Sequence, residues 1–195
     1  MWHQVTEPAR ESDVEAVLSL ARNAEPRCGV TVVVAIDGPS GSGKTTLAKG
    51  VAEALARLGT VEVVHMDLIF PGWDGLAEAP GLLATQVLEP IARGHPAAYR
   101  TWSWVREEWH GTRSVAACRF LVVEGCGASV GPARAYAALA VFVDADMRLR
   151  RRRGIARDGD VYRPQWQRWA DQEDELFSAD STRDRADLVI DTSSL

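Results

Sequence analysis

The chain is poor in cysteine. Only three of its 195 residues are cysteines (Cys28, Cys118 and Cys126), and none of them forms a CxxC pair or another metal-ligand spacing. This scarcity argues against a disulfide-stapled miniprotein and is typical of free thiols in a reducing compartment. The sequence therefore predicts a cytoplasmic protein.

Long apolar runs and an excess of basic residues are also lacking. No run approaches the roughly 20 apolar residues of a membrane span, and residues 1–10 carry Glu7 and no hydrophobic stretch. We expect neither a secretory signal nor a membrane partner. The 22 basic residues, of which only Lys44 and Lys49 are lysines, are outnumbered by 27 acidic ones. A net charge of −5 gives no general attraction to nucleic acid, so no nucleic-acid partner is expected.

Strand and helix patterns alternate along the chain. Buried-strand patterns occupy residues 30–36, 61–65, 118–124, 140–144 and 187–191. Helical patterns occupy residues 12–22, 44–58, 80–93, 146–157 and 164–177. This alternation predicts an α/β fold with a mostly parallel five-stranded sheet. Because no linker or internal repeat interrupts it, we expect a single domain over residues 1–195.

A complete phosphate-binding pattern, G-x-x-x-x-G-K-[ST], stands between the first predicted strand and the helix at 44–58. Its members are Gly38, Pro39, Ser40, Gly41, Ser42, Gly43, Lys44 and Thr45. Backbone N–H groups of such a loop cradle phosphate oxygens. Lys44 is expected on the β- and γ-phosphates, Thr45 on Mg²⁺ and Thr46 on the α-phosphate. The pattern predicts an ATP and Mg²⁺ site in a three-layer P-loop fold; an ordinary Gly/Ser-rich turn is the alternative.

Three carboxylates stand where predicted strands end. Asp67 follows the strand at 61–65, Glu124 ends the strand at 118–124, and Asp144 ends the strand at 140–144. Ligands of parallel sheets bind beyond these ends. We assign Asp67 as the base that takes a proton from an acceptor hydroxyl, and as a further metal candidate. Glu124 is assigned to the metal or the acceptor, whereas Asp144 has the alternative of capping the helix that follows it.

Together these segments resemble the uridine kinase-like branch of P-loop kinases, which includes phosphoribulokinase and pantothenate kinase. The resemblance covers about residues 30–192. It rests on the phosphate-binding pattern followed by His65-Met-Asp67-Leu-Ile-Phe70, Leu121-Val-Val-Glu124-Gly125, Val141-Phe-Val-Asp144 and Ala186-Asp-Leu-Val-Ile-Asp-Thr192. It implies an ATP-dependent transfer to a hydroxyl, with Asp67 activating the acceptor and Phe70 beside it. Trp102-Ser103-Trp104 departs from the Tyr-Asp-Phe of uridine kinases.

The resemblance also implies a helical lid over the triphosphate, at about residues 146–160. This stretch contains Arg148, Arg150, Arg151, Arg152, Arg153 and Arg157. Arg153 and Arg157 are assigned as phosphate contacts that neutralise the transferring group and exclude water. The alternatives are a solvated basic face paired with the acids at 171–175 and a local nucleic-acid patch.

The segment between the helix at 80–93 and the strand at 118–124 is where related kinases build the acceptor site. Tyr99, Trp102, Trp104 and Arg106 are therefore assigned to a flat, partly apolar pocket for a base or ring. Packing in the core is the alternative for the tryptophans.

The sequence thus predicts an ATP- and Mg²⁺-dependent kinase for a small-molecule acceptor, with a uridine-like nucleoside favoured. Two other functions stay open: a nucleoside monophosphate kinase, and a regulatory P-loop NTPase without a small-molecule acceptor. The sequence leaves open whether the chain forms a homo-oligomer.

Overall fold

A computed structural model describes residues 8–194, with the backbone alone at position 161. The first seven residues, part of the segment for which no secretory signal is predicted, lie outside the described range. Within that range, no helix combines the length and the apolar character that crossing a membrane requires.

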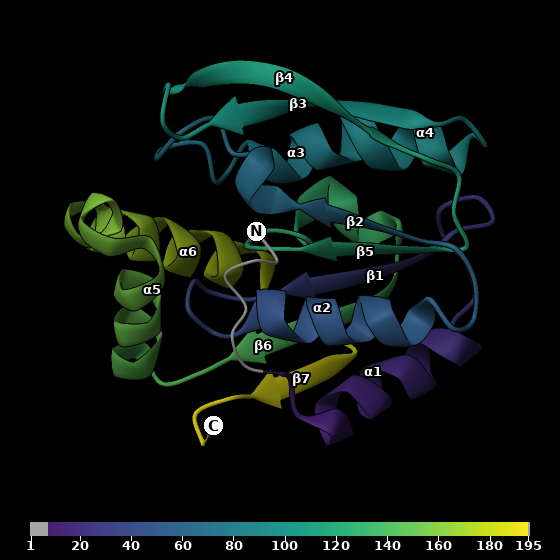
Figure 1. Cartoon of the computed structure of the whole chain (residues 1–195), viewed down its shortest axis with the longest axis horizontal. Helices are drawn as coiled ribbons and strands as arrows, with labels where there is room; N and C mark the ends of the chain where they lie inside the picture. The colour runs from purple at the N-terminus through teal and green to yellow at the C-terminus, as the bar shows by residue number, and fades with distance from the viewer. Residues whose placement is uncertain (1–7, 195) are drawn as a thin grey trace.

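The central sheet has the five strands that the sequence predicts. They are β1 (Val32–Asp37), β2 (Val61–His65), β5 (Phe120–Glu124), β6 (Ala137–Asp144) and β7 (Leu188–Asp191). Their order is β2-β5-β1-β6-β7, and every neighbouring pair is parallel. The carboxyl ends of all five strands therefore lie at one edge, on the left in Figure 1.

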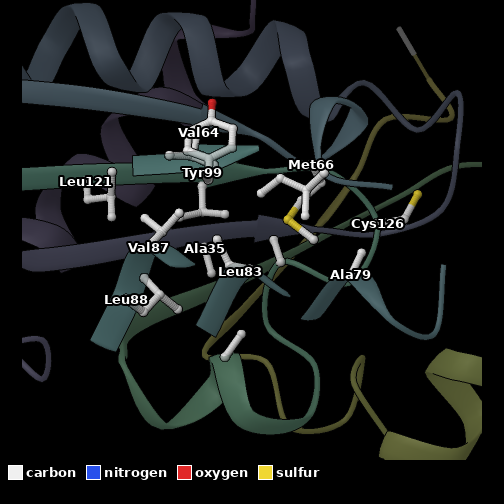
Figure 2. Packing of buried hydrophobic residues seen from close by; sticks show 14 of the residues in the cluster. Ala35, Val64, Met66, Ala79, Leu83, Val87, Leu88, Tyr99, Leu121 and Cys126 are labelled. Atoms are coloured by element: carbon white, nitrogen blue, oxygen red, sulfur yellow. The ribbon is translucent and has the colours of Figure 1, made fainter. Parts of the chain in front are cut away.

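Helices cover both faces of this sheet. Alternate residues of a strand point to opposite faces, and in β1 both sets of side chains are buried. On one face Val34 and Ile36 pack in a core with α1 (Glu11–Asn23) and α2 (Lys44–Leu55). On the other face Ala35 packs in a second core, shown in Figure 2. That core includes residues of α3 (Ala79–Leu83), a π-helical turn η3 (Ala84–Leu88) and α4 (Glu89–Ala92).

The predicted helix at 80–93 is thus divided into three short pieces. Pro90 is the second residue of α4 and has no N–H with which to bond the carbonyl four residues earlier. The wider bonding of η3 bridges this interruption, so the helical path continues with a change of register.

An antiparallel hairpin, which the sequence analysis did not predict, follows α4. It joins β3 (Ala97–Ser103) to β4 (Glu108–Val115) and lies over α3 and α4 at the top of Figure 1. Ala97, Tyr99 and Thr101 on alternate positions of β3 are buried. The hairpin thereby encloses the second core from outside.

Two helices lie beyond the carboxyl ends of the strands (Figure 1): α5 (Met147–Tyr162) and α6 (Trp166–Asp180), joined by the 3-10 turn η5 (Arg163–Gln165). Asp146 caps α5 by accepting hydrogen bonds from the N–H groups of Arg148 and Leu149. The cap is therefore not Asp144, whose carboxylate accepts the N–H of Ala145. Gly159 interrupts α5 with φ of 68°, a value that favours glycine.

Candidate active site

The phosphate-binding loop joins β1 to α2. Its glycines adopt positive φ angles, and two of them leave no room for a Cβ atom. Gly38, Gly41 and Gly43 have φ of 132°, 77° and 99°. A Cβ atom on Gly38 would lie 2.1 Å from the carbonyl oxygen of Val143, and one on Gly41 would lie 2.2 Å from that of Arg150. The glycines of the sequence pattern thus let β6 and α5 approach the loop backbone.

Lys44 and Thr45 begin α2 at the inner side of this loop. The Lys44 ammonium is nearly buried and donates a hydrogen bond to the Pro39 carbonyl at 2.8 Å. The Thr45 hydroxyl donates to Oε2 of Glu124 at 3.2 Å. The structure therefore brings together Thr45 and Glu124, which the sequence analysis assigned to the metal. Thr46, the next residue of α2, is partly buried.

His65 fixes the position of Glu124. The register of the parallel sheet places His65 of β2 beside Glu124 of β5, and Glu124 beside Ile36 of β1. Both side chains are buried, and Nδ1 of His65 lies 2.6 Å from Oε1 of Glu124. A hydrogen bond between these two atoms orients the Glu124 carboxyl group. Sequence analysis gave His65 no role in the site, since its partner is 59 residues away.

Asp37 ties the phosphate-binding loop to the loop after β5. This fully buried carboxylate accepts the N–H groups of Gly38, Gly127 and Ser129 at 2.7–2.8 Å and the Ser129 hydroxyl at 2.9 Å. Burial raises the pKa of Asp37, and these four donors lower it. An amide in its place would turn N–H groups toward at least one of these backbone donors, so the bonding pattern favours a carboxyl group at this position. Asp37 is a site residue that the sequence analysis missed.

Asp67 stands on the 3-10 turn η2 (Met66–Leu68), directly after β2. It lines a pocket of about 280 Å³ together with Ser40 of the phosphate-binding loop. The other lining residues are Leu68, Phe70, Trp73, Trp104, Arg157, Asp158, Tyr162 and Trp169. The predicted base, the loop and a wall of aromatic side chains therefore share one cavity.

The surroundings of Asp67 make it a stronger base than an ordinary aspartate. Removal from water is the largest effect and raises the pKa of its carboxyl. The positive charges of Arg157 and Lys44 lower this pKa, whereas the carboxylates of Glu124 and Asp158 raise it further. Asp67 thus lies within the electrostatic reach of both the loop lysine and the acid that holds Thr45.

Aromatic rings form most of the pocket wall. The Trp104 indole donates its N–H to the backbone carbonyl of Asp67 at 2.7 Å, which couples the hairpin turn to η2. Trp73 packs against Trp104 with ring centroids 4.7 Å apart and stacks on Tyr162 at 5.7 Å. Phe70, which the resemblance places beside the acceptor, also lines the cavity.

Three of the predicted acceptor-site residues lie outside this pocket. Tyr99 is buried in the core beneath the hairpin, where Figure 2 shows it near Val64. Trp102 packs edge-to-face on Trp109 with centroids 5.5 Å apart. Arg106 is exposed at the hairpin turn. The structure therefore brings only Phe70 and Trp104 of the predicted set to the cavity.

The two arginines assigned to phosphate take different positions. The Arg153 guanidinium donates to the hydroxyl and the carbonyl of Thr192 at 2.9 and 3.1 Å. The same hydroxyl donates to the Ser42 carbonyl at 2.7 Å, so Arg153 lies next to the phosphate-binding loop through Thr192. Arg157 pairs with Asp158 and lines the pocket of Asp67. The arginines are thus divided between the two halves of the site.

A buried acid on α6 supports the loop from the other side. Oε1 of Glu173 accepts the Ser40 N–H at 2.8 Å and the Cys126 thiol at 3.0 Å. Its Oε2 atom has no hydrogen-bond partner and lies 3.7 Å from the nearly buried guanidinium of Arg150. Glu173 therefore links α5, α6 and the phosphate-binding loop. The sequence analysis did not single it out, because nothing in the local pattern distinguishes it from the exposed acids around it.

The residues of the loop fit a nucleoside triphosphate and its metal. A Cβ on Gly38 or Gly41 would collide with neighbouring backbone, and the buried hydroxyl of Ser42 has no hydrogen-bond partner in the structure. The start of α2 adds the partial positive charge of its free N–H groups. The described residues contain no cluster of three or more His, Cys, Asp or Glu side chains able to hold a metal. A cation here would therefore take Thr45 and Glu124 together with phosphate and water oxygens, as is usual for Mg²⁺.

Solved structures with this arrangement of elements include several kinases. No protein-family model and no curated protein sequence matches the chain. A protein described as a possible uridine kinase from Bacillus stearothermophilus aligns with a TM-score of 0.69 and 21% identity, covering 92% of this chain and 98% of that one. A protein proposed to be a fructose transport system kinase, from Silicibacter sp. TM1040, aligns with a TM-score of 0.60 and 21% identity over 90% and 98%.

A D-glycerate 3-kinase from Cryptococcus neoformans aligns more loosely, with a TM-score of 0.52 and 12% identity over 89% of this chain and 87% of that chain. At such identities the comparisons establish the fold. The chain shares the α/β fold of these solved structures, as the sequence analysis predicts.

Proposed function

We propose that this chain is an ATP-dependent kinase that transfers the γ-phosphate to a hydroxyl group of a small molecule. The observation that carries the proposal is the shared cavity of Ser40 and Asp67. A phosphate-binding loop thereby adjoins a buried carboxylate of raised pKa, across a space large enough for an acceptor.

Different residues act at the two ends of this cavity: one end binds the triphosphate and the other binds the acceptor. Backbone N–H groups of the loop and the Lys44 ammonium bind the triphosphate, and Thr46 stands near the α-phosphate. Thr45 and Glu124 would hold Mg²⁺, which would neutralise negative charge on the phosphates. His65 keeps Glu124 oriented through their 2.6 Å contact.

At the acceptor end, Asp67 accepts the proton of the acceptor hydroxyl. The hydroxyl oxygen then bonds to the γ-phosphorus while the bond from that phosphorus to the bridging oxygen of ADP breaks. Arg157 is placed to neutralise charge on the transferring group once its pairing with Asp158 is exchanged. The surrounding indoles exclude water that would otherwise hydrolyse ATP.

The test is ADP release by the full chain with Mg²⁺, ATP and a panel of nucleosides, sugar acids and aromatic alcohols. We expect acceptor-dependent release that falls about 100- to 10,000-fold in Asp67→Asn, since general-base catalysis contributes about that much. Asp160→Asn, at a side chain that is 97% exposed, is the matched control and should retain full turnover.

Normal turnover in Asp67→Asn would overturn the assigned base. ATP hydrolysis that no acceptor stimulates would instead indicate a regulatory NTPase. A nucleoside such as uridine is the acceptor that the resemblance favours, and it belongs in the panel for that reason.

A further inference from the structure

The acceptor half of the cavity is walled by stacked aromatic rings. Trp73 and Tyr162 are nearly parallel at 15°, and Trp169 meets Trp73 edge-to-face at 85°. Trp104 is tilted against Trp73 at 56°. All four side chains line the cavity and contact one another, so they form an apolar wall against which a flat ring can pack.

The polar groups of this cavity include the side chains of Ser40, Asp67, Arg157 and Asp158. The Trp104 N–H is occupied by the Asp67 carbonyl at 2.7 Å, and Arg157 is paired with Asp158. No Asn, Gln, His or Thr side chain is among the described residues that line the cavity. A sugar or a nucleobase edge presents several donors and acceptors, and each one that the aromatic wall leaves without a partner would weaken binding roughly tenfold or more.

The charges of the cavity disfavour an anionic acceptor. Its lining holds two carboxylates, Asp67 and Asp158, against one guanidinium, that of Arg157, which is already paired with Asp158. An incoming phosphate or carboxylate would therefore meet more negative than positive charge in the lining, since Lys44, the other cation that acts on Asp67, is assigned to the triphosphate. A quaternary ammonium group needs several ring faces around one centre. Here Trp73 and Tyr162 face each other at 5.7 Å, too close to admit a ligand between them.

We propose that the acceptor is a neutral alcohol built on a flat aromatic or heteroaromatic ring. This inference rests on the proposed kinase activity. The ring lies on the surface of Trp73 and Trp104, and its hydroxyalkyl arm reaches Asp67. Such a molecule places its one strongly polar group at the one carboxylate that can use it.

The first experiment compares acceptors for the full chain with saturating ATP and Mg²⁺. The probes are benzyl alcohol, 3-pyridinemethanol, uridine, glycerate, choline and uridine monophosphate, with ADP release as the measurement. We expect kcat/KM for an aromatic alcohol to exceed that for each other probe at least tenfold. A higher kcat/KM for uridine, glycerate, choline or the monophosphate overturns the inference and leaves the kinase proposal standing. No acceptor-dependent release with any probe overturns both.

The second experiment tests the wall itself. Trp73→Leu should raise KM for the aromatic alcohol at least tenfold and leave KM for ATP unchanged, whereas Trp73→Phe, which keeps a ring, should recover part of the loss. Trp109→Leu is the matched control, because Trp109 packs on Trp102 outside the cavity. Thermal unfolding of each variant separates a lost contact from a lost fold. An unchanged KM in a folded Trp73→Leu protein overturns the inference.

Discussion

At the scale of single residues, the charge balance around Asp67 decides when the site can work. A general base must be ionised to accept a proton, so activity is lost as the pH falls through its pKa. Burial raises the pKa of Asp67, and Arg157 is the largest influence that lowers it. On the acid side of the pH profile, kcat/KM should therefore fall to half of its maximum at a pH above about 3.9, the pKa of an ordinary aspartate. We call this part of the profile the acid limb.

Replacing Arg157 tests this balance directly. Arg157→Gln removes the positive charge, so the pKa of Asp67 should rise and the acid limb should move to higher pH. The measurement is a kcat/KM profile against pH. Arg93→Gln, at an exposed arginine that pairs with Glu89 far from the cavity, should leave the limb where it is. An identical limb in the Arg157→Gln and unaltered proteins would contradict the electrostatic account.

The sequence could predict several of these residues individually. Lys44 and Thr45 follow from a spacing pattern, and Asp67 and Glu124 follow from their positions at strand ends. His65 and Glu173 could not be found in this way, because their hydrogen-bond partners are 59 and 133 residues distant in the chain. Local patterns contain no information on such pairs.

At the scale of elements, Asp37 joins two loops that start at neighbouring strands. The loop after β1 carries the phosphate-binding pattern, and the loop after β5 supplies Gly127 and Ser129 as donors to the same carboxylate. In Asp37→Asn the amide N–H₂ must face at least one of these donors. We expect the free energy of unfolding to fall by about 1–3 kcal/mol, measured by urea denaturation.

Asp144→Asn is the control for this change, since Asp144 ends the neighbouring strand β6 and its pairing with Arg183 is at the surface. It should cost less than about 1 kcal/mol. Equal stability of the Asp37→Asn and unaltered proteins would show that the two loops hold their positions without the carboxylate.

The hairpin is the element that the sequence analysis missed. Its first strand, β3, alternates between buried and exposed residues over most of its length, as Ala97, Tyr99 and Thr101 show, whereas β4 is almost wholly exposed. The segment was interpreted through its tryptophans as an acceptor site. Of these, Trp104 reaches the cavity because it stands at the turn, and Trp102 does not because it pairs across the hairpin with Trp109.

At the scale of the whole molecule, ligand binding and folding stability are coupled, because the phosphate-binding loop contacts several elements of the fold. The loop contacts β6, α5 and α6 through Val143, Arg150 and Glu173. A nucleotide on this loop should therefore stabilise the entire fold. ATP with Mg²⁺ at a hundred times its dissociation constant should add about 2.7 kcal/mol, which corresponds to a rise in Tm of about 5–10 °C.

The two lysines of the chain provide the matched pair for this measurement. Lys44→Ala removes the ammonium at the loop and should abolish most of the rise in Tm, whereas Lys49→Ala, one turn further along α2, should keep it. The same rise in both variants would argue against nucleotide binding at this loop.

The amino-acid pattern by itself determined the five strands of the central sheet, the phosphate-binding loop and the carboxylates at the strand ends. These features depend on residues close together in the chain, through side-chain periodicity and the conformational freedom of glycine. Tertiary structure alone decided which aromatic rings wall the cavity, which acids support the loop and how far Asp67 is removed from water. Those properties arise where η2, the hairpin turn, α5 and α6 meet, and packing between distant segments sets them.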